Sequence, residues 1–287
     1  MCAKHSGHPN PEGSSITTIT KSYIHTFTQR EHERLIHQAD YLVPWIHGGI
    51  DFSDCKSVLE IGCGVGAQLK ILAKRFPDTY FTGVDFAPEQ IAAATILLAA
   101  EIAAGQVTLI EGSAYEIPFS DRTFDGVFIC WVLEHLENPA AAIREAARVM
   151  KPGGILFDTE VFNSGVYCDP PRAALLEYWG AFNTLQREFG GHPDIGMRLA
   201  NLAVESGLKD VELTEITPHL NKQLTQAERA EMASYFCAIF LSGSGSLLKK
   251  GRVSKELVDR MRKDFDLIGR DPDSIMVYRG YQLRAVR

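Results

Sequence analysis

The stretch from Val58 to Gln68 reads VLEIGCGVGAQ, in which an apolar run is followed by glycine at positions 62, 64 and 66. This pattern predicts a strand that ends in a tight turn, because a residue without a Cβ accepts left-handed backbone conformations. A bare main chain at the end of a strand also lets a ligand approach closely. The stretch therefore indicates a ligand-binding turn ahead of a helix that begins near Ala67.

Short β-branched runs and helical segments alternate over the hundred residues that surround this turn. The ends of the helical segments agree with the pattern, since Pro88 and Pro139 suit the first turn of a helix and Gly105 suits a stop. Such alternation predicts a parallel sheet with helices on both faces. The predicted strands read SVLEIG, YFTGVD, VTLIEG, FDGVFIC and GILFDTEV.

Helical segments are predicted on both sides of this alternating region, near residues 29–47, 171–189, 195–206, 226–241 and 254–268. Two further strands are expected near residues 211–216 and 275–286. We find no internal repeat and no linker, so we expect one domain over residues 21–287 after a disordered tail at residues 1–20. The expected fold is α/β, a doubly wound, mostly parallel sheet of about seven strands, with a helical cap from residues 21–50, 163–207 and 225–270.

Composition limits the possible partners. A formal net charge of -7 and the absence of basic runs argue against nucleic acid, because phosphate backbones are bound by clustered Lys and Arg. The longest apolar stretch, from Ile91, is interrupted by Glu101 and is too short to cross a bilayer. The six cysteines show no metal-site spacing, and the first residues lack the apolar core of a secretory signal. A cytoplasmic protein without a metal is the expectation, with the oligomeric state open.

An acidic residue follows the glycines at the distance typical of nucleotide-binding folds. Asp85 ends the second predicted strand, 19 residues after Gly66, and with Ala67 the turn satisfies the pattern GxGxxG/A. A carboxylate at this place accepts hydrogen bonds from ribose hydroxyls of a bound nucleoside. The pattern by itself leaves open whether the nucleoside belongs to a dinucleotide or to another cofactor.

Five motifs in order carry a resemblance to a known family: VLEIGCGVG, GVDFAPEQ, EGSAYEIPF, FDGVFICWVLEHLENP and VMKPGGILF. Over residues 58–162 the chain resembles the class I S-adenosylmethionine-dependent methyltransferases, especially small-molecule enzymes similar to the ubiquinone and menaquinone C-methyltransferases. The resemblance implies a Rossmann-like methyltransferase fold and S-adenosylmethionine as cofactor. Glu60 agrees with it, because a carboxylate opposes a pyrophosphate but suits the cationic amino group of a methionine moiety.

The resemblance also implies a set of cofactor-binding positions. Ser113 stands where the family commonly has Asp, and Ala87 where a helix-capping Ser is frequent, so the contacts of these two positions are expected to differ from the family pattern. The implied cofactor-binding residues are Glu60, Gly62, Gly64, Gly66, Asp85, Phe86, Gln90, Ser113, Ala114 and Cys130.

The candidate catalytic residues are His135, Glu160 and Tyr23. His135 follows the fourth predicted strand and could act as a general base or be a structural histidine. Glu160 shares a strand face with Asp158 and could hold an acceptor or be solvated. Tyr23 precedes the first helix, where it could belong to a lid or to an ordinary surface segment.

The predicted function is transfer of a methyl group from S-adenosylmethionine to an oxygen, nitrogen or carbon atom of a small hydrophobic or aromatic metabolite. The segment CWVLEHL lacks the (D/N)PP(Y/F) motif of many enzymes that methylate bases or glutamine, which favours a small-molecule acceptor. Helical spacing of Tyr235, Phe236 and Phe240 indicates either an apolar acceptor pocket or helix packing. Two alternatives remain, an NAD-dependent oxidoreductase and a protein that binds S-adenosylmethionine without transferring methyl.

Overall fold

The strand that precedes the glycine turn lies at the centre of the molecule. In the computed structural model, which describes residues 28–287, β1 (Ser57–Ile61) is buried from Val58 to Ile61 and pairs in parallel with strands on both sides. Such burial is typical of a parallel strand covered on both faces, and Glu60 is the one charged residue in this strand. The other strands are β2 (Tyr80–Asp85), β3 (Val107–Glu111), β4 (Phe124–Cys130), β5 (Met150–Asp169), β6 (Lys209–Ile216), β7 (His219–Leu220) and β8 (Ile275–Val286).

Within residues 28–287 these strands form one eight-stranded sheet in the order β3-β2-β1-β4-β5-β8-β6, with β7 paired to β8. The first five strands are parallel, and β8 is antiparallel to both β5 and β6. The predicted mostly parallel, doubly wound sheet is therefore confirmed. The two-residue β7 was not expected, because a pair of residues carries no periodicity.

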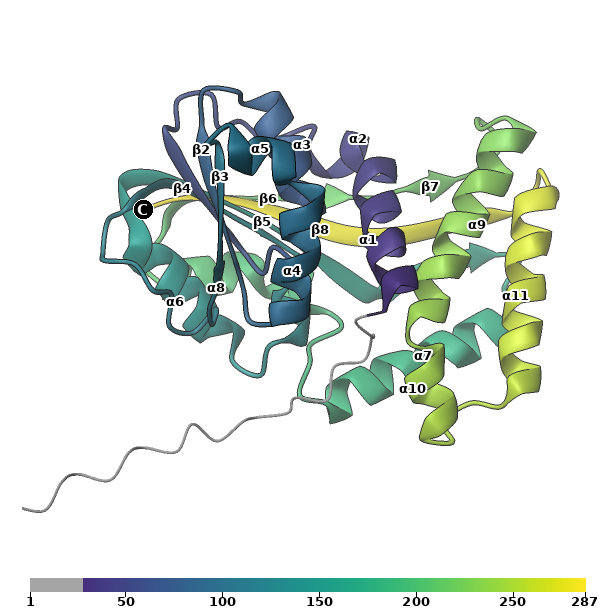
Figure 1. Ribbon diagram of the computed structural model, residues 1–287. Helices are drawn as coiled ribbons and strands as arrows, with labels where there is room; N and C mark the ends of the chain where they lie inside the picture. The colour runs from purple at the N-terminus through teal and green to yellow at the C-terminus, as the bar shows by residue number, and fades with distance from the viewer. Residues whose placement is uncertain (1–27) are drawn as a thin grey trace, which may run out of the picture.

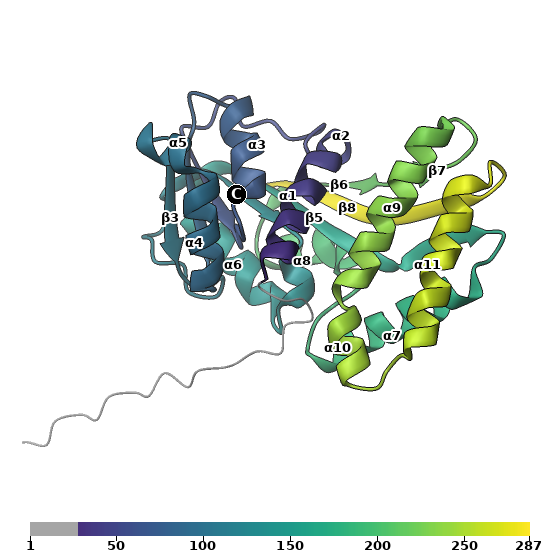
Figure 2. The same ribbon diagram turned by 45° about the vertical axis from the view of Figure 1, so that its right-hand side comes forward.

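Helices cover both faces of the sheet (Figures 1 and 2). One face packs against α3 and α4 and the other against α6 and α8, in two separate hydrophobic cores. The helices are α1 (Gln29–Tyr41), α2 (Val43–Ile46), α3 (Ala67–Arg75), α4 (Pro88–Leu97), α5 (Ala99–Ala103), α6 (Pro139–Val149), α7 (Ala173–Glu188), α8 (Leu199–Glu205), α9 (Gln226–Ser242), α10 (Ser244–Lys249) and α11 (Lys255–Arg270), with 3-10 turns η1 (Leu133–His135) and η2 (Ile195–Arg198).

Two predicted helices are each divided in the structure. The segment at residues 29–47 breaks at Leu42, because Pro44 suits the first turn of a new helix and cannot continue the preceding one. The helix expected between a start at Pro88 and a stop at Gly105 breaks at Leu98, which separates α4 from α5. Other helix ends follow local signals, such as Asn138, whose side chain accepts a hydrogen bond from the Ala141 N–H at the start of α6.

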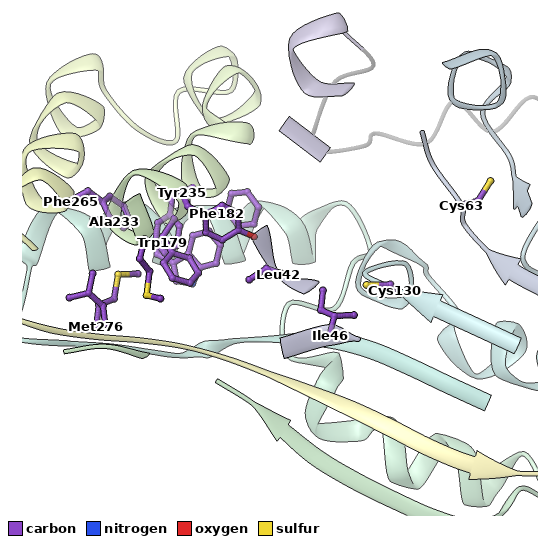
Figure 3. Packing of buried hydrophobic residues seen from close by; sticks show 14 of the residues in the cluster. Leu42, Ile46, Cys63, Cys130, Trp179, Phe182, Ala233, Tyr235, Phe265 and Met276 are labelled. Atoms are coloured by element: carbon purple, nitrogen blue, oxygen red, sulfur yellow. The ribbon is translucent and has the colours of Figure 1, made fainter. Parts of the chain in front are cut away.

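Strands β5 and β8 continue beyond the shorter strands, and α7, α9, α10 and α11 lie around their far ends (Figures 1 and 2). Figure 3 shows Trp179, Phe182 and Tyr235 gathered there, and the Trp179 ring stacks on Phe182 and Phe240 at centroid distances of 4.6 and 3.8 Å. Tyr235, Phe236 and Phe240 are therefore part of a packed core between helices. None of the described helices is long and apolar enough to span a bilayer.

The N-terminal helices are held against the sheet by three hydrogen bonds to main-chain oxygens. Gln282 of β8 donates to the Ile46 oxygen at 2.8 Å, and Arg75 of α3 donates to the oxygens of His47 and Ile50. These bonds link α2 to two elements distant in sequence. The preceding helix α1 lies near the carboxyl ends of the parallel strands (Figure 2).

Candidate functional site

A cavity of about 390 Å³ lies at the carboxyl ends of β1, β2 and β4. This is where ligands bind in open parallel sheets, because the strand order reverses between β1 and β4. Its wall combines the glycine turn, the ends of three strands, one side of α1 and the end of α7. The polar or charged members of the wall are Gln38, Glu60, Gln68, Asp85, Gln90, Ser113, Tyr115, His135, Glu137 and Gln186.

The three predicted glycines have different surroundings. All have positive φ, of 71° at Gly62, 50° at Gly64 and 78° at Gly66. A Cβ on Gly64 would meet no described heavy atom within 4 Å, whereas one on Gly66 would lie 2.6 Å from Leu98. Gly62 and Gly64 line the cavity, whereas Gly66 is not one of the described residues that line it. Gly66 is instead the N-cap residue of α3, and its lack of a Cβ lets it lie against Leu98.

Two carboxyl groups at neighbouring strand ends line the cavity. Glu60 is 2% exposed, and its Oε2 atom has no hydrogen-bond partner among residues 28–287. Burial, and then the charge of Asp85, raise the pKa of Glu60 well above its usual value. Asp85 accepts hydrogen bonds of 2.9 Å from the N–H groups of Gly64 and Ala87, and burial raises its pKa too.

The predicted adenine-side residues come together on the same wall. Phe86 and Gln90 follow Asp85. Phe86 is 61% exposed, and the Gln90 side-chain oxygen is buried without a hydrogen-bond partner in the described part of the chain. Ser113 and Ala114 follow β3 and also line the cavity. The Ser113 hydroxyl accepts a 3.1 Å hydrogen bond from the Tyr115 N–H, so its lone pairs are partly engaged.

The end of β4 carries Cys130 and Trp131 into the wall. Trp131 has φ of 55°, a left-handed conformation that costs a residue with a side chain about 1–2 kcal/mol. Its N–H donates to the Thr159 oxygen at 2.9 Å, which helps to hold this turn. Burial raises the pKa of Cys130 well above its usual value, so its thiol is a poor nucleophile and serves as a wall residue.

His135 ends the 3-10 turn η1 and lines the cavity with its side chain 17% exposed. Burial lowers the pKa of this imidazole and Arg34 of α1 lowers it further, while Glu134 opposes both effects. The Nε2 atom lies 3.6 Å from the Glu134 Oε1 atom. The imidazole is therefore neutral at neutral pH, which is the form that can accept a proton.

Glu160 has a different position from the one expected of an acceptor-binding residue. Its carboxylate accepts hydrogen bonds from the N–H groups of Val132, Leu133 and Glu134 at 2.8, 2.7 and 3.3 Å. Glu160 and Asp158 are fully buried, and neither belongs to the described residues that line the cavity. Glu160 thus supports η1 from beneath, and the expectation of a solvated residue is wrong.

The third catalytic candidate, Tyr23, lies outside the described residues.

Gln68 also lines the cavity, although no sequence motif marks it as a binding residue. Its side-chain nitrogen donates to the Cys130 sulfur at 3.8 Å, and its oxygen lies 2.6 Å from the His47 Nε2 atom. Burial lowers the pKa of His47 to about 4, so this imidazole stays neutral and donates to Gln68. A place in the first turn after the glycines is the one local sign that could have indicated Gln68.

Other wall residues come from distant segments. Leu35, Gln38 and Ala39 lie on α1, and Gln186, Phe189 and Gly191 lie at and after the end of α7. No local pattern relates these segments to the glycine turn, because their position depends on how the cap packs on the sheet.

The wall fits S-adenosylmethionine better than a dinucleotide. An unpartnered buried oxygen of Glu60 suits an ammonium group, and the Asp85 carboxylate suits a pair of ribose hydroxyls. The open face of Gly64 admits a ligand against the main chain. A pyrophosphate here would meet two carboxylates in a poorly solvated place, where like charges repel strongly.

Comparisons with known proteins agree with this geometry. Residues 59–158 match the family model described as a methyltransferase domain. The chain is 28% identical to the O-methyltransferase resE of Aspergillus sclerotiorum over 55% of this chain and 57% of that protein. It is 32% identical to a demethylmenaquinone methyltransferase of Roseiflexus castenholzii over 49% of this chain and 57% of that protein. The matches thus span less than two thirds of these relatives.

A solved structure shares the fold at low sequence identity. It is a phosphoethanolamine N-methyltransferase 2 of Haemonchus contortus in complex with phosphomonomethylethanolamine and S-adenosylhomocysteine. The TM-score is 0.59 at 18% identity, over 93% of this chain and 59% of that one. This likeness concerns the architecture of the sheet and its helices.

Proposed function

Because the chain belongs to the class I S-adenosylmethionine-dependent methyltransferases, we propose that it methylates an oxygen atom of a small hydrophobic or aromatic metabolite. Bound S-adenosylmethionine supplies an electrophilic methyl group on a positively charged sulfur. The proposal depends above all on the unpartnered Oε2 atom of Glu60 in the cavity wall. A buried carboxylate in such a position is costly unless a cationic ligand group meets it.

The residues of the wall have separate tasks in this proposal. Glu60 holds the amino group of the methionine moiety, Asp85 holds the ribose hydroxyls, and Phe86 covers one side of the adenine. Gln90, Ser113 and Ala114 complete the adenine pocket, while Gly62, Gly64 and Cys130 form the surface along which the cofactor lies. Methyl transfer by in-line displacement needs mainly alignment of the two reactants, which these fixed positions support.

The acceptor is proposed to lie between α1, the turn at Trp131 and the end of α7. Apolar lining there by Leu35, Trp131 and Phe189 favours a hydrophobic or aromatic acceptor. These side chains also exclude water from the reacting atoms. His135 accepts the proton that a hydroxyl group loses when its oxygen forms the new bond to carbon.

Oxygen is favoured over carbon and nitrogen by two observations. A neutral imidazole in the wall suits a weakly acidic hydroxyl, which must lose a proton, while an amine can react through its lone pair first. Among the relatives, resE is named an O-methyltransferase. The demethylmenaquinone methyltransferase supports a quinone-like size and apolarity for the acceptor.

The test is incubation of the full chain with S-adenosylmethionine and 2-naphthol, followed by mass spectrometry of both products. We expect 2-methoxynaphthalene and S-adenosylhomocysteine in equal amounts. When 2-methoxynaphthalene replaces 2-naphthol as the acceptor, no S-adenosylhomocysteine should form. A wider panel of phenols, aromatic amines and hydroquinones extends the search. Methylation of amines or ring carbons alone would refute the choice of oxygen. Binding of S-adenosylmethionine without transfer to any compound of the panel would favour the non-methylating alternative.

A further inference from the structure

The two oxygens of the Glu134 carboxylate face different partners. Oε2 accepts a 2.7 Å hydrogen bond from the Gln186 Nε2 atom, and Oε1 lies 3.6 Å from the His135 Nε2 atom. Glu134 is 8% exposed, so neither contact is strongly weakened by water. One oxygen is thus held by α7 while the other is directed at the imidazole in the cavity wall.

Gln186 is itself held in one orientation. Its oxygen accepts from the Asn163 Nδ2 atom at 3.3 Å, and the Asn163 oxygen accepts from the Tyr278 hydroxyl at 3.0 Å. A rotated Gln186 amide would place its oxygen against the Glu134 carboxylate and its NH₂ group against that of Asn163. Both contacts would be repulsive, so the chain from β8 through β5 to α7 determines which group meets Glu134.

The main chain of Glu134 is fixed as firmly as its side chain. Its N–H donates to the Glu160 carboxylate at 3.3 Å, and its oxygen accepts from the His192 N–H at 2.7 Å. A Cβ on Gly191 would lie 2.6 Å from the same oxygen, so glycine is needed where this loop crosses η1. Glu134 therefore has little freedom to turn away from His135.

We propose that Glu134, clamped by Gln186, is a positioning residue that directs and supports His135 as the base of methyl transfer. This inference rests on the proposed function. The acceptor O–H bond breaks as its oxygen attacks the methyl carbon, and the proton passes to the Nδ1 atom of His135. The electron pair of the S–CH₃ bond stays on sulfur, which becomes neutral. The new imidazolium presents its Nε2–H to the Glu134 Oε1 atom.

The separation of 3.6 Å is longer than a hydrogen bond but within the range of an ion pair. Glu134 therefore attracts a charged imidazolium much more than a neutral imidazole. An interaction that grows as the proton is transferred lowers the barrier, because it is stronger in the transition state than in the ground state.

Several charged groups surround His135. Arg34 of α1 acts against protonation, although the Glu31 carboxylate binds its guanidinium at 2.9 and 2.6 Å. Glu160 lies beneath the turn, and Glu137 lines the cavity beyond it. Glu134 is the group that raises the pKa of His135 against burial and Arg34. Its loss should therefore lower that pKa further.

The experiment is an NMR titration of the His135 imidazole in the full chain saturated with S-adenosylhomocysteine. The resonance is assigned by its absence from His135→Asn. We expect Glu134→Gln and Gln186→Met to shift the midpoint to lower pH, with the larger shift in Glu134→Gln. Glu205→Gln, which removes an exposed charge on α8, should leave the midpoint unchanged. Gln186→Met keeps the test decisive should Glu134→Gln fail to fold.

Unchanged midpoints in folded variants that bind S-adenosylhomocysteine would overturn the inference. This result does not depend on turnover, so it is separate from a failure of the proposed function. With 2-naphthol as acceptor, Glu134→Gln should lower kcat about 10-fold or more and move the acidic limb of the pH–rate profile to lower pH. The KM for S-adenosylmethionine should stay within about twofold. A shifted midpoint with an unchanged kcat would also reject the positioning role.

Discussion

The main-chain N–H of Gly64 donates a 2.9 Å hydrogen bond to the Oδ2 atom of Asp85. The bond joins the glycine turn after β1 to the end of β2, so the two features that we propose bind the cofactor are held in one arrangement before a ligand arrives. Preorganisation of this kind lowers the entropy that binding must overcome. The turn and the carboxylate are therefore expected to act as a single unit in binding.

A methyl group added at Gly64 should block the cofactor without unfolding the protein. Gly64→Ala and Gly105→Ala both place a side chain at positive φ in open space, so each should cost about 1–2 kcal/mol of stability. Of these two glycines, only Gly64 lines the cavity, so only its added methyl group would meet the cofactor. Calorimetry with S-adenosylhomocysteine should show at least about 10-fold weaker binding for Gly64→Ala and wild-type binding for Gly105→Ala. Equal affinities would contradict the placement of the cofactor.

Binding of S-adenosylhomocysteine should release a proton from Glu60. Burial and Asp85 raise the pKa of Glu60 in the free protein, and a bound ammonium group should lower it. Affinity should therefore increase as pH rises from the usual Glu range through the raised pKa. Calorimetry in two buffers of different ionisation enthalpy measures the released proton.

Glu60→Gln should abolish that proton release and weaken binding by about 10-fold or more, since a hydrogen bond to a charged group contributes about 1.5–3 kcal/mol. Persistence of the full proton release in the variant would assign the titration to Asp85 instead.

Replacement of His135 should separate binding from turnover. His135→Asn removes the base but leaves Glu60 and Asp85 in place, so the Kd of S-adenosylhomocysteine should stay within about twofold. Turnover with 2-naphthol should fall about 10²–10⁴-fold, the usual contribution of a general base. Equal losses of binding and turnover would make the residue structural. A variant that turns over normally would exclude it as the base.

Asp158 should destabilise the folded protein at neutral pH. Neither of its oxygens has a hydrogen-bond partner within residues 28–287, and burial raises its pKa well above the usual value. An acid whose pKa is raised by folding loses stability as pH rises from its unfolded value towards its folded value. Asp158→Asn should therefore be more stable than wild type by about 1–3 kcal/mol at pH 7 and similar to it near pH 4.

Urea unfolding from pH 4 to 8 measures this difference. Asp78→Asn, a change at an exposed residue, should follow the wild-type curve throughout. If Asp158→Asn were less stable than wild type at every pH, the buried carboxyl group would have a partner that stabilises it.

The catalytic candidates show the limit of sequence patterns. Spacing placed Glu160 at the end of a strand, yet β5 continues to Asp169. The partners of Glu160 are three N–H groups 28, 27 and 26 residues away in sequence, in a turn that folds back over it. His135 was found because it lies in the turn after β4, at the edge of the sheet where the carboxyl ends of the parallel strands meet. Glu134 was missed, because its significance depends on Gln186, which is 52 residues away.

The sequence alone determined the parallel sheet and the rim where we propose the cofactor binds, because the positions of both follow from local rules. Alternating apolar runs define the strands, glycines permit the left-handed turn, and the carboxyl ends of parallel strands meet at one edge, which brings Glu60, Gly64 and Asp85 together. Only the tertiary structure shows the side of the cavity where we propose that the acceptor binds. There the wall joins α1, η1 and α7, and which side chains meet depends on the packing of the cap, since the energies of contacts between distant segments leave no periodic trace in the chain.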